Sequence, residues 1–213
     1  MSSEHHISYQ TKGRYFVHGD LNTSSKLLIV LHGYGYLAQY FIRKFQHLDP
    51  NEFSVICPEA PHKFYQKGTN GRVGASWMTK ENRLTDIENY ISFLDTLLNQ
   101  VKSNHQFESI HLIGFSQGGA TASRWLAYGQ HHFDSFTLWA TVFPPDMEKE
   151  YHQKINQSQN FFVFGTKDDY YSMEKVAEHF EEIEKKGLNF QMINFDGGHD
   201  IDKSALEQIT HEI

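Results

Sequence analysis

The fold is decided by the stretch Ile110-His-Leu-Ile-Gly-Phe-Ser-Gln-Gly-Gly119, in which a glycine-flanked serine joins two different kinds of segment. Residues 110–115 have the largely apolar character of a strand buried on both faces, and residues 117–128 have helical spacing. Between them, the pattern Gly114-x-Ser116-x-Gly118 is typical of a nucleophile elbow, a strained strand-to-helix turn where glycines avoid clashes. The stretch therefore predicts a strand–turn–helix unit with Ser116 at its bend. The alternative is a glycine-rich tight turn without chemistry.

Strands and helices alternate on both sides of this unit. We expect an opening hairpin (7–10 and 15–18), strands over 26–31, 53–57, 136–142, 161–164 and 190–195, helices over 37–48, 84–98, 176–186 and 204–213, and a long loop over 59–82. Such alternation needs right-handed crossovers, which give a mostly parallel sheet with helices on both faces. The sequence predicts one α/β domain over residues 1–213, with an N-terminal antiparallel hairpin and no large cap domain.

Composition and charge exclude several classes of protein. The chain has 213 residues, of which 39% are hydrophobic and 21% charged, so disorder and collagen-like repeats are excluded. A net charge of −7, with no basic run longer than two residues, repels polyanions, so we expect no nucleic-acid partner. The longest apolar run, Leu27–Leu31, is far shorter than the ~20 residues of a membrane span, and the N-terminus does not resemble a secretory signal. We therefore expect a cytoplasmic protein.

Cysteine and histidine usage argues against disulfides and metals. The single cysteine, Cys57, excludes an intrachain disulfide. The 14 histidines are scattered, and none belongs to an HExxH motif or to a Cys-rich metal-ligand spacing. We expect no metal ion and no other cofactor.

Two polar loops follow predicted strands downstream of Ser116. One carries Asp168 and Asp169, and the other carries His199 in Asp196-Gly-Gly-His199. Both loops should lie at the carboxyl edge of the sheet, where open α/β sheets place their catalytic groups. A serine nucleophile needs a base and an orienting acid, and chains built on this elbow carry them in the order Ser, Asp, His. Either aspartate could be the acid. The alternatives are a helix N-cap for Asp168 and an exposed loop position for His199.

A glycine-rich turn, Leu31-His-Gly-Tyr-Gly35, directly follows the strand over 26–31. Such a turn can aim a backbone N–H at a carbonyl oxygen that becomes negative during attack. The N–H groups of Tyr34 and of Gln117, the residue after the candidate nucleophile, are the expected oxyanion hole. His32 could act as a further base, but we expect it to hold the loop through hydrogen bonds.

Several segments together resemble a known family. They are Leu31-His-Gly-Tyr-Gly35, Pro58-Glu-Ala-Pro61, Ser76-Trp77, Gly114-Phe-Ser-Gln-Gly-Gly119, Gly165-Thr-Lys-Asp168 and Gly197-Gly-His199. In this order they resemble the phospholipase/carboxylesterase family of the α/β-hydrolase fold, which includes acyl-protein thioesterases. The resemblance implies Ser116 as nucleophile, His199 as base and Asp168, three residues after the glycine, as acid.

The chain also departs from that family at three places. Tyr36 follows Gly35 where relatives often have aspartate, Met78-Thr79 stand where they have Phe-Asp, and Asp169-Tyr-Tyr171 replace hydrophobic residues after the acid. These changes surround the expected pocket and leave the triad intact. The sequence therefore supports the reaction type more strongly than it supports any particular substrate.

We interpret the chain as a serine hydrolase that cleaves small carboxylic esters or thioesters through an acyl-enzyme, with a small-molecule substrate. The alternatives are an acyltransferase on the same scaffold and a catalytically silent ligand-binding protein. Monomer and homodimer are equally compatible with the sequence. Trp77 should either line the acyl site or anchor its loop. The acyl-wall candidates, each of which could instead be a core residue, are Tyr36, Phe64, Trp77, Phe143 and Tyr170.

Overall fold

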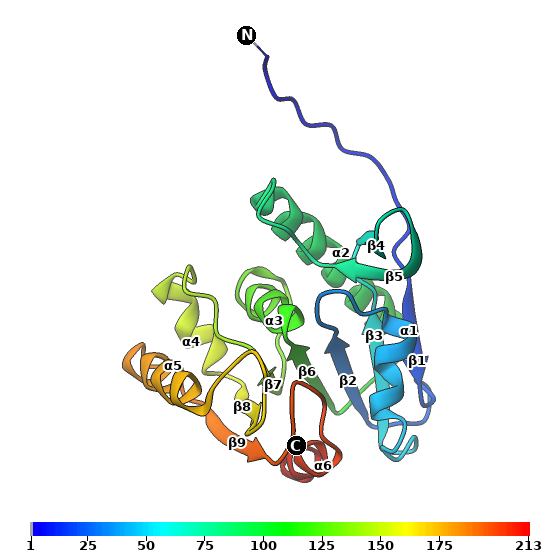
Figure 1. Ribbon diagram of the computed structural model, residues 1–213. Helices are drawn as coiled ribbons and strands as arrows, with labels where there is room; N and C mark the ends of the chain where they lie inside the picture. The colour runs from blue at the N-terminus through cyan, green and yellow to red at the C-terminus, as the bar shows by residue number, and fades with distance from the viewer. Residues whose placement is uncertain (1) are drawn as a thin grey trace.

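A twisted seven-stranded sheet, in the order β1-β3-β2-β6-β7-β8-β9, forms the centre of the computed structural model, which describes residues 2–213 (Figure 1). Its strands are β1 (Tyr15–His18), β2 (Lys26–Leu31), β3 (Phe53–Pro58), β6 (Ser109–Phe115), β7 (Ser135–Trp139), β8 (Gln159–Gly165) and β9 (Gln191–Phe195). Every neighbouring pair is parallel except β1 with β3. The predicted mostly parallel sheet is therefore confirmed.

The helices follow the strands in the expected alternation. They are α1 (Ala38–Phe41), α2 (Arg83–Asn104), α3 (Gln117–Tyr128), α4 (His152–Ile155), α5 (Met173–Lys185) and α6 (Lys203–Glu212), with 3-10 turns at Ile42–Phe45 and Lys149–Tyr151. The helix expected over 37–48 is a short α1 continued by a 3-10 turn, and the short α4 was not predicted. Among residues 2–213, no helix has both the length and the apolar character that crossing a membrane requires.

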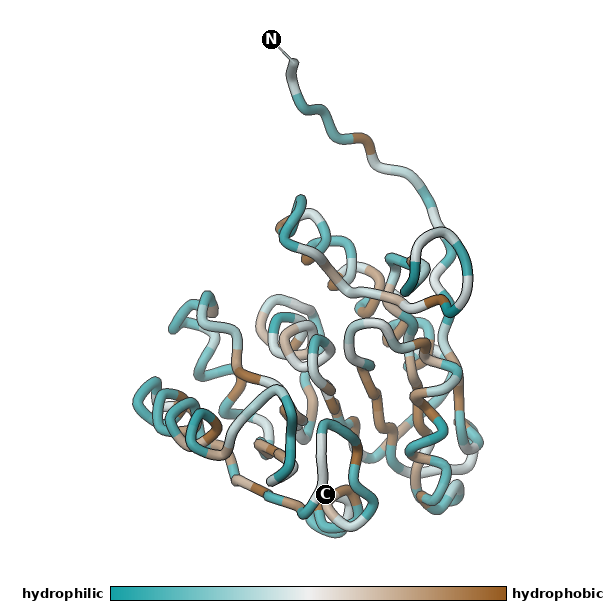
Figure 2. The backbone as a smooth tube through the Cα atoms, in the orientation of Figure 1, coloured by the Kyte–Doolittle hydropathy of each residue, from teal (hydrophilic) through white to brown (hydrophobic). Residues whose placement is uncertain are grey.

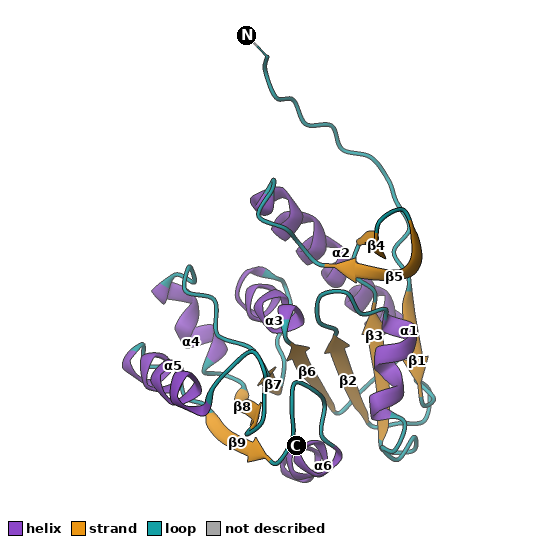
Figure 3. Cartoon of the chain, in the orientation of Figure 1, coloured by secondary structure: helices purple, strands orange, loops and turns teal. Residues whose placement is uncertain are grey.

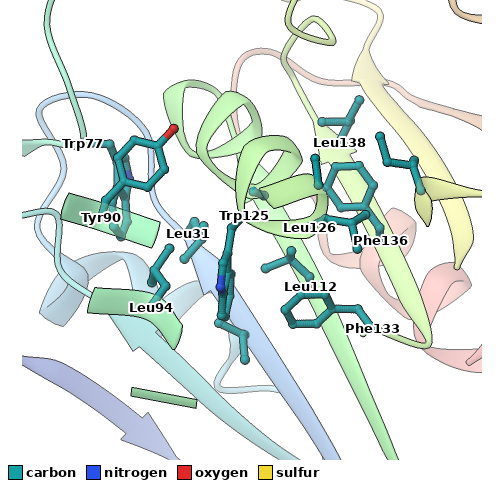
Figure 4. Packing of buried hydrophobic residues seen from close by; sticks show 14 of the residues in the cluster. Leu31, Trp77, Tyr90, Leu94, Leu112, Trp125, Leu126, Phe133, Phe136 and Leu138 are labelled. Carbon is teal, nitrogen blue, oxygen red and sulfur yellow. The ribbon is translucent and has the colours of Figure 1, made fainter. Parts of the chain in front are cut away.

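Both faces of the sheet are covered, as the sequence predicts. Side chains alternate along β2, so that Leu27, Ile29 and Leu31 belong to one buried cluster and Leu28 and Val30 to another. Helices α2, α3 and α5 pack on the first cluster, and α1 and α6 pack on the second. Figure 4 shows part of the first cluster around α3, and Figure 2 shows the hydrophobic central strands. The apolar run of β2 is thus explained by burial on both sides.

The opening hairpin is not formed. Within residues 2–14 the chain has no helix or strand, and it extends away from the body of the protein (Figure 3). β1 instead pairs antiparallel with β3, with Tyr15 opposite Pro58 and His18 opposite Val55. Ile7 and Tyr9 are 89% and 81% exposed, so pairing 7–10 with β1 would add a strand without apolar burial to support it.

The long loop expected over 59–82 contains a separate two-stranded hairpin. It consists of β4 (His62–Lys67) and β5 (Asn70–Ser76), which pair antiparallel and lie beside the turn after β2 (Figure 1). The tip includes Gly68 and Gly71, both with positive φ, which glycine adopts without strain. Most β4 side chains are exposed, so the segment lacks the alternating apolar pattern that identifies a strand in sequence.

Candidate functional site

Ser116 occupies the strained turn that the sequence predicts. It lies between the end of β6 and the start of α3, and its backbone has φ 52° and ψ −122°. A non-glycine residue in such a region costs on the order of 1–3 kcal/mol and persists only where its surroundings hold it. Here the Ser116 N–H donates to the Trp139 carbonyl at 2.9 Å, and the Gly119 N–H donates to the Ser116 carbonyl at 2.9 Å. The elbow is thereby fixed to β7 and to its own helix.

The glycines of the elbow allow α3 to approach the sheet closely. A Cβ on Gly114 would stand 2.5 Å from the Gly119 Cα, and a Cβ on Gly118 would stand 2.2 Å from the Leu31 carbonyl oxygen. Both distances are too short for real atoms, so each position requires glycine. The contact with Leu31 also brings the start of α3 against the turn that follows β2.

His199 and Asp168 form a close pair at the same edge of the sheet. The His199 Nδ1 and Asp168 Oδ2 atoms are 2.7 Å apart, and the Asp168 side chain is completely buried whereas that of His199 is 14% exposed. The other carboxylate oxygen, Oδ1, accepts the N–H groups of Tyr170 at 2.8 Å and Tyr171 at 3.3 Å. In the neutral ring, a carboxylate at Nδ1 holds the proton there and leaves the lone pair on Nε2.

The two loops that carry this pair are packed against each other. The Lys167 N–H donates to the Gly197 carbonyl at 2.9 Å, and a Cβ on Gly165 would stand 2.3 Å from that same oxygen. Asp169 is exposed, and the N-cap of α5 is Ser172 rather than either aspartate. Of the two candidate acids, Asp168 is therefore the one that contacts His199.

The imidazole lies beside the elbow. Its ring centroid is 5.0 Å from that of Phe115, the residue before Ser116. Within residues 2–213 the Ser116 hydroxyl makes no hydrogen bond, so His199 packs on the residue before the serine without engaging the serine itself. Such contacts often tighten only when substrate is bound.

The turn after β2 runs directly against Ser116. A Cβ on Gly33 would stand 3.0 Å from the Ser116 Cβ, so only a glycine fits without displacement. In the described part of the chain, the backbone N–H groups of Tyr34 and Gln117 have no hydrogen-bond acceptor. Two donors without acceptors therefore lie close to the serine, one in the next residue and one in the turn packed against it, and both are candidates for an oxyanion hole.

The β4–β5 hairpin clamps this turn, a contact that the sequence did not reveal. The Gly35 N–H donates to the Ala75 carbonyl at 2.9 Å, and the Ala75 N–H donates to the Tyr36 carbonyl at 3.1 Å. The Gln66 amide donates to the Gly35 carbonyl at 2.6 Å. Gly74 lies so close that a Cβ there would stand 2.7 Å from the Gly35 Cα. The hairpin thus sets the position of the turn that carries Tyr34.

The segment after β5 holds the other side of the site. The Gln117 side chain accepts the Trp77 N–H at 3.0 Å through Oε1 and donates to the Met78 carbonyl at 2.8 Å through Nε2. The Trp77 indole donates to the His32 carbonyl at 2.9 Å. Both candidate oxyanion donors are therefore attached to one continuous stretch of backbone.

His32 holds the turn through hydrogen bonds, as the sequence favours. Its ring is completely buried, Nδ1 donates to the Gly33 carbonyl at 2.8 Å, and Nε2 accepts the Ala60 N–H at 3.1 Å. Burial lowers the pKa of His32 to about 4, against opposing effects of the Gly33 carbonyl and the Glu59 carboxylate. A buried neutral ring whose two nitrogens are both engaged is not available as a base.

The buried His32 makes stability depend on pH. Its pKa falls from 6.5 in the unfolded chain to about 4 in the folded one, so the unfolded state binds more protons between these values. Stability is lost as pH falls through this window, by roughly 2–3 kcal/mol at pH 4.5. We expect His32→Asn to lower the Tm at pH 7. Between pH 7 and pH 4.5, however, the Tm of the variant should fall by at least about 5 °C less than the Tm of the wild type.

Thermal unfolding at the two pH values checks this expectation. His47→Asn, at an exposed histidine, is the matched control and should keep the wild-type pH dependence. Burial also lowers the pKa of His111 to about 4, so part of the acid sensitivity should remain in the His32 variant. An unchanged slope in His32→Asn would contradict the assignment.

Three of the five acyl-wall candidates lie around the site with accessible surface. Tyr36 is half-buried and packs edge-on against Phe115 at 5.9 Å, and the half-buried Phe64 stacks on Tyr34 at 4.9 Å. Tyr170 is 73% exposed, with its ring 4.6 Å from that of His199.

The other two candidates are core residues. Trp77 and Phe143 are completely buried, so neither offers surface to a ligand. Trp77 contacts Tyr90 in the cluster beneath the site and anchors its segment through the indole N–H (Figure 4). The backbone N–H of Phe143 donates to His179 Nε2 at 2.7 Å. The expectation that these two rings line a pocket is corrected, because an aromatic residue near a site fills the core as readily as it lines a wall.

Over the described residues 2–213, no three or more His, Cys, Asp or Glu side chains are grouped so that they could hold a metal ion.

Solved structures of esterases share this fold. The esterase PE8 is 18% identical, with a TM-score of 0.69 over 95% of this chain and 98% of its own. Acyl-protein thioesterase 2 from Zea mays is 17% identical, with a TM-score of 0.71 over 94% of this chain and 97% of its own. A phospholipase/carboxylesterase from Dyadobacter fermentans is 15% identical, with a TM-score of 0.66 over 96% and 97%. The α/β-hydrolase fold expected from the sequence is confirmed.

At the level of sequence, residues 21–209 match the family described as serine hydrolase (FSH1). No curated protein matches the chain.

Proposed function

Because the chain belongs to the serine hydrolase (FSH1) family, we propose that it cleaves small carboxylic esters or thioesters through an acyl-enzyme formed on Ser116. One observation carries the proposal: the imidazole that contacts the buried Asp168 at 2.7 Å packs on Phe115, the residue before a serine held at positive φ. A serine in that turn with an oriented imidazole next to it is the arrangement that activates a hydroxyl for attack.

In the proposed reaction, the Ser116 Oγ attacks the carbonyl carbon while His199 Nε2 takes the hydroxyl proton. Asp168 holds the ring and stabilises the imidazolium that forms. The negative charge on the carbonyl oxygen is bound by the N–H groups of Tyr34 and Gln117. The imidazolium then protonates the leaving alcohol or thiol, and a water molecule, deprotonated by the same ring, releases the carboxylic acid and regenerates the serine.

The test combines a covalent probe with a substrate series. A fluorophosphonate should label the wild type, and p-nitrophenyl esters of increasing chain length should be hydrolysed with a preferred acyl length. Ser116→Ala should do neither. Wild-type protein that fails to react with probe and esters would exclude a hydrolase and favour a silent scaffold. Transfer of the acyl group to an added alcohol in preference to water would instead favour an acyltransferase.

The clamp on the oxyanion turn leads to a further prediction. In Gly74→Ala the new methyl group would clash with the Gly35 backbone at 2.7 Å and displace the turn that carries the Tyr34 N–H. Removing one oxyanion donor costs about 10²–10³-fold in kcat, so we expect a loss on the order of 10²-fold. Steady-state kinetics on one p-nitrophenyl ester, with circular dichroism to confirm folding, measure the effect.

Gly68→Ala is the control for Gly74→Ala, because at a φ of 59° an alanine strains the same hairpin, but no atom lies within 4 Å of the new methyl group. It should lose less than about 3-fold in kcat, because the strain stays at the hairpin tip and the added methyl group does not touch the turn that carries Tyr34. Equal losses in the two variants would show that the hairpin affects activity through general destabilisation rather than through the oxyanion turn.

A further inference from the structure

The position of the leaving group follows from the orientation of His199. Its Nδ1 is occupied by Asp168 at 2.7 Å, so Nε2 is the nitrogen that can protonate the departing oxygen or sulfur. Proton transfer needs the two heavy atoms within about 2.6–3.2 Å. The alcohol or thiol portion of the substrate must therefore lie against the imidazole, next to whatever side chains border its open side.

Three aromatic rings border the imidazole, and they differ in accessibility. Phe115, at 5.0 Å between centroids, is completely buried and belongs to the core beneath the site. Tyr171, at 6.4 Å, is half-buried and packs on Phe164, whereas Tyr170, at 4.6 Å and inclined by 56°, is 73% exposed. Tyr170 is thus the ring with the most exposed surface beside the imidazole, so a group that approaches His199 from solvent can contact it.

The backbone of Tyr170 is fixed relative to the catalytic pair. Its N–H donates to Asp168 Oδ1 at 2.8 Å, on the opposite side of the carboxylate from the contact with His199. Because this hydrogen bond is made by the main chain, it survives any change of the side chain other than to proline. The ring can therefore be removed without removing a hydrogen bond of the triad.

Tyr36 extends the same rim. Its ring packs edge-on against Phe115 at 5.9 Å, so it lies on the His199 side of the elbow. Burial raises the pKa of the Tyr36 hydroxyl, and the negative charges of Asp200 and of ionised Tyr170 raise it further. Tyr36 and Tyr170 thus place two phenol rings next to the Phe115–His199 pair, one on each of its members.

We infer that Tyr170 is a specificity-determining residue that contacts the leaving group and favours esters whose alcohol or thiol portion is aromatic. This inference rests on the proposed function, and it assigns Tyr170 to the leaving-group side rather than to the acyl wall. An offset or edge-on contact between two aromatic rings is worth about 2- to 13-fold in a binding constant. The contact exists only until the leaving group departs, so it should affect acylation and not deacylation.

The experiment compares leaving groups at constant acyl group. Benzyl acetate and ethyl acetate form the same acetyl-enzyme, so any difference between them arises before the leaving group departs. We expect Tyr170→Ala to lower kcat/KM for benzyl acetate 5- to 10-fold more than for ethyl acetate, and Tyr170→Phe to keep the wild-type ratio. Tyr9→Ala, at a tyrosine exposed in the N-terminal segment, is the matched control and should change neither value.

A second series separates the two sides of the substrate. For benzyl acetate and benzyl hexanoate, Tyr170→Ala should lower kcat/KM by the same factor. A changed preference for acyl length, with an unchanged benzyl-to-ethyl ratio, would overturn the inference and return Tyr170 to the acyl wall. Equal losses for benzyl and ethyl acetate would also overturn it, because they would indicate that the ring acts only on His199.

Failure of this inference can be told apart from failure of the proposed function. Fluorophosphonate labelling of the wild type and of Tyr170→Ala reports the serine alone. If both are labelled and the leaving-group ratio does not change, the hydrolase remains and the role of Tyr170 is wrong. If the wild type is neither labelled nor active, the proposed function itself is wrong.

Discussion

Asp168→Asn should lower kcat by on the order of 10⁴-fold, because an amide that donates a hydrogen bond to Nδ1 would stabilise the tautomer with its proton on Nε2. Such a ring cannot accept the serine proton. The wild-type carboxylate accepts from Nδ1 at 2.7 Å and is held by two backbone N–H groups, so the substitution should change the chemistry with little change in the loop. Steady-state kinetics and a thermal melt of the purified variant measure both effects.

The neighbouring aspartate provides the control for this substitution. Asp169 is exposed and carries the same charge one residue further along the chain, so Asp169→Asn makes the same change in net charge without altering His199. Its loss should be less than about 3-fold, as for most surface substitutions. A reversed ranking of the two variants would move the acid to Asp169.

Ser116→Ala and His199→Ala should each lower kcat by about 10³-fold or more, and the double variant should be little worse than either single one. The reason is that the serine and the imidazole act as one unit: without the base the hydroxyl is a poor nucleophile, and without the hydroxyl the base has no proton to accept. All three variants should fold, because His199 is on a loop and Ser116 makes no side-chain hydrogen bond within the described residues. The measurement is kcat on one p-nitrophenyl ester for the wild type, the two single variants and the double variant.

Multiplication of the two losses would contradict a shared mechanism, because independent groups contribute additively in free energy. The residual activity of the double variant is informative as well. The free backbone donors of Tyr34 and Gln117 remain in every variant, so rate enhancement over water should persist if they form the oxyanion hole.

Much of the fold could be predicted because it is encoded locally. The β6–Ser116–α3 unit lies where the apolar stretch, the glycines and the helical spacing place it, and α3 has the bounds expected. The alternation along β2 follows from burial on both faces of a parallel sheet. In the site, the loops after β8 and β9 carry Asp168 and His199 to one edge, since parallel strands all end there.

Other features required contacts between residues that are distant in sequence. The partner of β1 is β3, some 40 residues away, rather than the segment beside it, because only the sheet edge provides a partner with apolar support. The β4–β5 hairpin could not be predicted, because its segment is polar and rich in glycine. The hairpin affects the site through the contact of Gly74 with Gly35. Nothing in the residues near Gly74 indicates that contact.

The sequence by itself determined the alternation of the strands and helices of the main sheet, the elbow at Ser116 and the carboxyl-edge positions of Asp168 and His199, because periodicity and turn preferences depend on adjacent residues. Only the tertiary structure distinguished Asp168 from Asp169 as the partner of His199. It also placed Trp77 and Phe143 in the core and left Tyr170 exposed beside His199. The physical reason is that burial and side-chain direction are properties of the surroundings: an aromatic ring has the same hydrophobicity in the core and on a rim, and packing alone decides where it lies.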